Sequence, residues 1–167
     1  MNETWDKELL KEIEELFSET GAEVYTEEFS GTQVVVAEYE EGETPEDCNV
    51  SVMHLTEDST EISVMISVMS GLDEKQSDDI AALIPYLNRY LSVGSFGIAK
   101  QDGYFWFGCS NVIDENTGRS ILLKIAAAMV DIAYNTASEA AAMILPVVNG
   151  EAQVSELMNE DTSIVQF

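Results

Sequence analysis

The side chains that most often carry out catalysis are few in this sequence. It contains one histidine, His54, and two cysteines, Cys48 and Cys109. A histidine acts as a general base only beside a nucleophile and an orienting partner, and the sequence identifies neither for His54. No basic residue adjoins either cysteine to lower its thiol pKa, so we expect both to be small buried apolar residues. The GxSxG, P-loop and GxGxxG motifs are also missing. We predict that the protein is not an enzyme and uses no cofactor.

Carboxylates are abundant, and the chemistry that they could offer is metal binding. Zinc needs histidine and cysteine ligands, which are too few here. The densest acidic run, Glu38–Asp47, contains glycine and proline but not the ligand spacing of a calcium loop. We predict a solvated loop at this run and no metal site.

The net charge limits the kinds of partner. With 32 acidic and 7 basic residues, the formal net charge is −25. Such a surface repels phosphate backbones, so we expect no nucleic-acid partner. Two interpretations of the charge stay open, since it could keep the protein in solution or attract a basic partner.

The compartment can be predicted from the same composition. The acidic N-terminus lacks the features of a signal peptide. The most apolar stretch, Ile121 to Ala133, is interrupted by Lys124 and too short to span a bilayer. The two cysteines form no disulfide-rich pattern, which suits a reducing compartment. We expect a cytoplasmic protein without a membrane partner.

Two neighbouring stretches, Cys48–Leu55 and Glu61–Met69, alternate as β-strands do, and their two faces differ in kind. One face is β-branched and suits a core: Val50, Val52, Ile62, Val64, Ile66 and Val68. The other face alternates serine with methionine: Ser51, Met53, Ser63, Met65, Ser67 and Met69. Methionine is unbranched and polarisable, so such a surface can repack around different apolar partners. The alternative is that a helix of the same domain covers this face and the methionines are core.

The remaining periodicities place three helices and further strands around this pair. Thr4 or Asn2 can cap an N-terminal helix. Its buried stripe is predicted to contain Trp5, Leu9, Ile13, Leu16 and Phe17. Strands are expected over 23–29 and 33–39, and a hairpin over 94–112 that turns at Asp102-Gly103. Gly97 and Gly108 in this hairpin predict a close approach to the sheet.

A central helix is expected to begin near Ser77 and to end at Gly94, with Pro85 inside it. A long final helix runs from Arg119 to Leu145 and ends at Pro146. It is apolar nearly all round, so one side should remain for self-association, and we expect a homodimer. The predicted fold is one α+β domain over 1–150, with five to six antiparallel strands and these three helices. Residues 151–167 are predicted to form a loosely ordered acidic tail.

This layout resembles the YbjN-type family of bacterial sensory-transduction regulators. The matching residues are Leu87-Asn88 in the central helix, Gly94 with Phe96, and the Asp102-Gly103 turn. The resemblance implies the fold of type III secretion chaperones, which is an antiparallel sheet with helices in a compact and commonly dimeric sandwich. It also implies binding of a protein chain rather than catalysis. The family has no catalytic motif whose residues could be carried over.

We therefore predict a module, chaperone-like or regulatory, that binds a protein or peptide through the apolar surface of its sheet or last helix. The residues predicted to contact the partner are Met53, Met65, Met69 and Trp106. A second hypothesis is an acidic inhibitor or immunity-type protein that blocks a basic partner by charge complementarity. A third is a sensor with a small-molecule pocket near Trp106.

Overall fold

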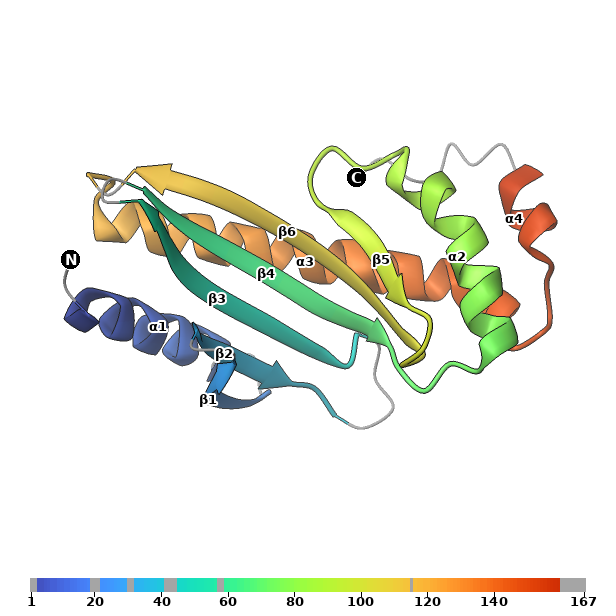
Figure 1. Cartoon of the computed structure of the whole chain (residues 1–167), viewed down its shortest axis with the longest axis horizontal. Coiled ribbons are helices and arrows are strands. Elements are labelled where there is room, and N and C mark those ends of the chain that lie inside the picture. The colour runs from blue at the N-terminus through green and yellow to red at the C-terminus, as the bar shows by residue number, and fades with distance from the viewer. Residues whose placement is uncertain are drawn as a thin grey trace.

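The computed structural model contains one antiparallel sheet with a helical layer (Figure 1). It describes residues 3–18, 22–29, 32–40, 45–56, 59–114 and 116–159. The side chains of Trp5 and His54, for which predictions were made above, lie outside this description. The α+β class and the three main helices are confirmed.

The strands follow the predicted alternation closely. They are β1 (Glu23–Phe29), β2 (Thr32–Glu38), β3 (Asp47–Thr56), β4 (Ser59–Met69), β5 (Ser95–Ala99) and β6 (Tyr104–Asp114). All pair antiparallel in the order β1-β2-β3-β4-β6-β5, so β6 lies between β4 and its hairpin partner β5. The sheet thus has six strands, the upper end of the predicted range.

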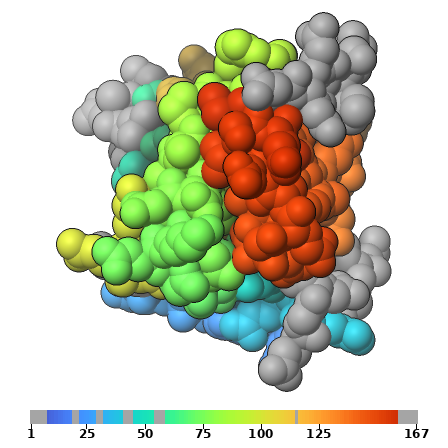
Figure 2. Space-filling model, turned by 90° about the vertical axis from the view of Figure 1, so that its right-hand side faces the viewer, coloured from blue at the N-terminus to red at the C-terminus, as the bar shows by residue number. Residues whose placement is uncertain are grey.

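The helices are α1 (Glu3–Ser18), α2 (Glu74–Asn88), α3 (Arg119–Val148) and α4 (Val154–Asn159). α3 packs on β4 and β6 along the length of the sheet, and α1 and α2 both contact α3 (Figure 1). α4 packs against α2, as Figure 2 shows for the red and green segments. α1, α2 and α3 share one core with the sheet, in which Phe105 and Phe107 are the largest fully buried side chains.

The central helix begins earlier than predicted. Asp73, not Ser77, is its N-cap: the Asp73 carboxylate accepts the Gln76 backbone N–H at 2.8 Å, and the Gln76 side chain accepts the Asp73 N–H at 2.9 Å. This reciprocal pair satisfies two helix-end donors, whereas Ser77 is buried inside the helix. The predicted start at Ser77 is therefore wrong.

The predicted ends of two helices are also wrong. α2 ends at Asn88, well before Gly94, because the Asn88 side chain binds both the N–H and the C=O of Phe96 at the start of β5. α3 continues past Pro146 to Val148, since a proline in the last turn removes only one helix hydrogen bond. The carbonyl of Pro146 instead accepts the N–H groups of Glu151 and Ala152.

The hairpin turn is confirmed at Asp102-Gly103. Gly103 has a φ of +60°, and a Cβ there would lie 2.3 Å from the carbonyl oxygen of Leu72. Glycine is thus required at position 103 both by its own backbone conformation and by the nearby backbone of Leu72.

The region predicted as a loose tail begins with ordered structure. Residues 154–159 form α4, whose Val154 and Leu157 pack against the core. The prediction for 160–167 lies outside the described residues.

By length and composition alone, α3 could cross a membrane. Its buried side chains, such as Leu122, Met129 and Ile144, instead belong to the core that it shares with the sheet. Core helices of globular proteins pass the same test, so this property does not assign α3 to a membrane.

Candidate binding surface

One side of β3, β4 and β6 carries side chains that no described helix covers (Figure 1). We call this side the open face. The strand pairing places on it Asn49, Ser51, Met53, Glu61, Ser63, Met65, Ser67, Trp106, Ser110 and Val112, of which Ser67 is fully buried. The opposite side carries the predicted β-branched residues, all of them buried. The alternative that a helix of the domain covers the serine–methionine face is therefore wrong for the described part of the chain.

The strand register places the exposed apolar side chains at two levels of the open face. Met53 lies opposite Glu61, which in turn lies opposite Val112. Met65 lies opposite Gly108, four residues along β4 from Glu61, which is about 13 Å in an extended strand. Met53, Met65 and Val112 are 44%, 40% and 58% exposed. The two levels form ridges with a gap between them, one made by Met53, Glu61 and Val112 and the other by Asn49, Met65 and Gly108.

Serines fill the gap between these ridges. Ser51, Ser63 and Ser110 lie opposite one another on β3, β4 and β6, so they form a row across the strands. Neighbouring strands are about 4.8 Å apart, and serine side chains are short. The serine row is therefore a shallow trough that is lined with hydroxyl groups and bordered by methionines.

Trp106 lies flat on the sheet. A Cβ on Gly97 would lie 2.2 Å from Cζ2 of the Trp106 ring, and one on Gly108 would lie 3.1 Å from its Cζ3. The predicted close approach at these two glycines is thus made by an indole of the same chain. The ring is half-buried and lies two residues from Gly108, the cross-strand neighbour of Met65. Trp106 therefore forms a rigid apolar platform beside a flexible methionine.

Met69 does not share the open face, contrary to the prediction. The register of β4 shifts between Ser67 and Met69, so that Met69 lies opposite Phe105. Such a bulge moves a side chain to the other face of the sheet. Met69 is buried in the core, and Met53, Met65 and Trp106 are the predicted contact residues that the structure places on the open face.

The end of the open face near Trp106 is acidic. Asp47, the first residue of β3, lies opposite Ser67 and accepts a hydrogen bond from the Asn49 amide at 2.6 Å. Burial raises the pKa of the Asp47 carboxyl, and the nearby Glu46 and Glu38 raise it further against the lowering effect of Asn49. Glu46 is held by Ser67 Oγ at 3.3 Å and by the Ser70 N–H at 3.0 Å.

Glu46 and Asp47 are the last two residues of the run Glu38–Asp47, which was predicted to be a loop. Glu38 is the last residue of β2, and residues 41–44 lie outside the description. The Tyr25 hydroxyl donates a hydrogen bond to Glu38 at 2.7 Å. Mainly through this bond, the carboxylate raises the pKa of Tyr25 to about 12. The cluster is therefore a fixed set of negative charges beside the apolar surface.

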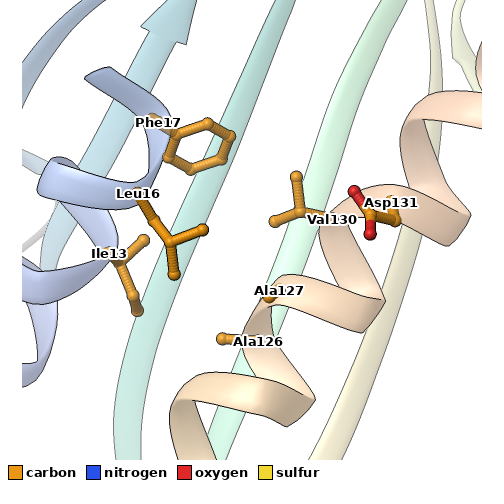
Figure 3. Close-up of a pocket in the computed structure, with 7 residues that line it drawn as sticks. All are labelled: Ile13, Leu16, Phe17, Ala126, Ala127, Val130 and Asp131. Carbon is orange, nitrogen blue, oxygen red and sulfur yellow. The ribbon is translucent and has the colours of Figure 1, made fainter. Parts of the chain in front are cut away.

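A second apolar feature lies between α1 and α3 (Figure 3). It is a hollow of about 120 Å³. Its lining is Ile13, Leu16, Phe17, Ala126, Ala127, Val130 and Asp131. Leu16 was predicted to be buried but is 42% exposed, because its side chain points into this hollow (Figure 3).

The residues suited to catalysis are not assembled into a site in the described part of the chain. Cys48 and Cys109 are both buried, as predicted, and burial raises the pKa of each thiol. A raised pKa leaves less of the thiolate, which is the nucleophilic form. Among the described residues, no group of three or more histidine, cysteine or acidic side chains could hold a metal ion.

Of the comparisons with known proteins, one of structures finds a match and two of sequences do not. No family model matches the chain, and no curated protein matches it. Its structure is similar to the crystal structure of YbjN, a putative transcription regulator from E. coli. The similarity covers 80% of this chain and 91% of that chain, with 11% identity and a TM-score of 0.44. The likeness concerns overall shape, and it shows neither a partner nor an activity for this chain.

Sequence reasoning missed Val112 as a member of the open face. The alternation of Trp106, Gly108 and Ser110 continues to Val112, so the period of two would have included it. The sequence held no corresponding sign of the bulge that buries Met69, because neither Ser67 nor Met69 is a typical bulge residue.

Proposed function

We propose that this protein is a non-enzymatic binding domain that holds a segment of a partner protein on the open face of its sheet. The observation that carries the proposal is the exposure of Met53, Met65 and Val112 on a sheet face that no described helix covers. Sheet faces with large apolar side chains are normally buried against another layer, so this face is suited to receive one from outside.

The chemistry of the face favours an apolar segment with exposed backbone groups. Burial of apolar area contributes roughly 25 cal/mol per Å², and methionine ridges can adjust to different side chains. The hydroxyls of the serine row, between the ridges, can bind backbone amides of a partner segment. Trp106, fixed on Gly97 and Gly108, supplies the rigid aromatic contact that binding hot spots often contain.

The test is a comparison of two methionine substitutions. Met65→Asp places a charge in the centre of the open face, and Met158→Asp places the same charge on α4, where Met158 is 46% exposed. We expect Met65→Asp to abolish capture of a partner from the native cell lysate at high salt, and Met158→Asp to retain it. Both variants should melt within a few degrees of the wild type, because exposed substitutions change stability by about 0.5 kcal/mol.

Two results would contradict the proposal. Equal capture by wild type and Met65→Asp would show that the open face is not the binding surface. Unfolding of Met65→Asp would show that this methionine is part of a buried core in solution.

The second candidate, an acidic inhibitor of a basic protein, is favoured by the fixed carboxylates of Glu38, Glu46 and Asp47 and by the net charge of −25. The two candidates differ in salt dependence. A complex formed by exposed charges weakens as salt rises, because screening acts beyond about 10 Å at 0.1 M. A partner retained at high salt supports apolar binding, and one retained only at low salt supports inhibition.

A further inference from the structure

The basic residues of this protein all lie outside the strands of its sheet. None of the six described strands contains a lysine or an arginine. The seven basic residues of the chain belong instead to α1, to α2 and its C-cap, to α3, and to the turn between β5 and β6. A cationic segment on the open face therefore meets no like charge from the strands beneath it.

Three carboxylates lie side by side at one level of the sheet, at the end of the open face near Trp106. The strand register places Glu23 of β1 opposite Glu38 of β2, and Glu38 opposite Asp47 of β3. We call these three residues the carboxylate row. Side chains directly opposite in a sheet are about 5 Å apart, and like charges at this distance destabilise the pairing. In the part of the chain that the structure describes, no lysine or arginine forms an ion pair with any of the three.

The level of the carboxylate row continues across the sheet to an indole. Asp47 lies opposite Ser67, and Ser67 lies opposite Trp106. At about 4.8 Å per strand, the backbones of Asp47 and Trp106 are about 10 Å apart. One side of the indole rests on Gly97 and Gly108, which leaves the other side for a ligand. The outward face of an indole attracts both apolar groups and cations.

The negative charge also acts on the residues beside the indole. Tyr104 precedes Trp106 by two residues on β6, so both project from the same side of the sheet. Burial raises the pKa of the Tyr104 hydroxyl, and the carboxylates of Asp47 and Glu46 raise it further against the lowering effect of a hydrogen bond with Ser67. The aromatic end of the open face is therefore an acidic environment.

We propose that the segment bound by the open face is amphipathic and cationic, with apolar side chains on Met65 and Trp106 and lysine or arginine side chains along the carboxylate row. This inference rests on the proposed function and adds the charge of the partner and its direction. The segment crosses the strands, because the row does. Its basic side chains begin about 10 Å from the indole contact and extend about 10 Å further, as far as Glu23.

Other occupants match this surface less well. Among the described residues, no three acidic side chains are gathered closely enough to hold a metal ion. A second copy of the same face would place carboxylates against carboxylates, because the strands supply no cation. A purely basic segment would leave Met65, which is 40% exposed, without an apolar neighbour. Cationic side chains that follow an apolar stretch match both parts of the surface.

The test uses three fluorescently labelled synthetic peptides of equal length, each with one half rich in leucine and tryptophan. The other half contains lysines in the first peptide, serines in the second and glutamates in the third. We expect the lysine peptide to bind most tightly and the glutamate peptide most weakly, as measured by fluorescence anisotropy at low salt. The differences should disappear at about 1 M salt, where charges are screened beyond about 3 Å, while the apolar contribution remains.

Two double variants locate the effect. Glu23→Gln with Glu38→Gln should weaken binding of the lysine peptide about fivefold, since exposed ion pairs are individually weak, and should leave the serine peptide unaffected. Glu139→Gln with Glu151→Gln, in and after α3, makes the same change in net charge and should alter neither affinity. All four glutamates are exposed, so circular dichroism should show an unchanged fold.

The outcomes separate this inference from the proposed function. Equal affinities for the lysine and serine peptides at low salt would overturn the inference, and loss of both on Met65→Asp would leave the proposed function in place. Binding of both peptides that is unaffected by Met65→Asp would contradict the proposed function itself. An equal loss in the two double variants would show a general effect of charge and overturn the inference. Failure of the lysine peptide to bind at millimolar concentration would also overturn it.

Discussion

The contact between Trp106 and Gly97 permits a sharp test of the open face. In Gly97→Ala the new methyl group would lie 2.2 Å from Cζ2 of the indole, far inside van der Waals contact. Gly97 is a strand residue with ordinary φ, so alanine itself fits its backbone. The strain must therefore be relieved by movement of the Trp106 ring or by separation of β5 from β6.

The loss of stability caused by Gly97→Ala can be bounded from this geometry. Restoring ordinary contact at 3.4 Å or more requires a movement of over 1 Å, and overpacking of this kind costs about 1–3 kcal/mol. Without the Trp106 ring, the effect of Gly97→Ala on the free energy of unfolding should reverse in sign. In a Trp106→Ala background the methyl group has space, and replacement of glycine stabilises by about 0.4–1 kcal/mol because the unfolded chain loses freedom.

The assay is a double-mutant cycle of urea unfolding followed by far-UV circular dichroism. Trp5→Phe in all proteins lets the fluorescence of those that retain Trp106 report this indole alone. Gly97→Ala should be destabilising and shift the emission to the red as the indole enters water. The same substitution should be neutral or stabilising when Trp106 is alanine. If Gly97→Ala has equal effects in both backgrounds and leaves the emission unchanged, the flat packing of the indole is refuted.

Two further predictions concern the ends of the elements around this surface. Asp73→Ala should lower the free energy of unfolding by about 1 kcal/mol, measured in urea, since it removes the N-cap of α2; Asp73→Asn should retain most of it. Asp47→Asn should stabilise the protein, and the gain should grow as pH rises from 4 to 7. The reason is that the raised pKa of Asp47 makes its ionised form unfavourable in the folded state. The gain should vanish below the pKa of the unfolded state, about 3.9, where Asp47 is protonated in both states. Thermal melts across pH measure this, with the exposed Asp102→Asn as the control for net charge.

Most of the fold could be predicted because its elements depend on local patterns. The strict alternation of residues 61–69 predicted β4. Asp102-Gly103 predicted the hairpin turn, in which Gly103 adopts a positive φ. The errors occurred where a tertiary contact decided the outcome. Asn88 ends α2 because its side chain binds the backbone of Phe96 in β5, a contact that exists only once the helix end and the strand have come together.

The candidate surface could be predicted only in part, for the same reason. The alternation of side chains along the two strands assigned Met53 and Met65 to one face of the sheet, but it did not reveal whether a helix covers that face. That depends on where α1, α2 and α3 pack, and all three share one core on the other side. The bulge after Ser67 was equally invisible, because it is defined by the pairing of β4 with β6.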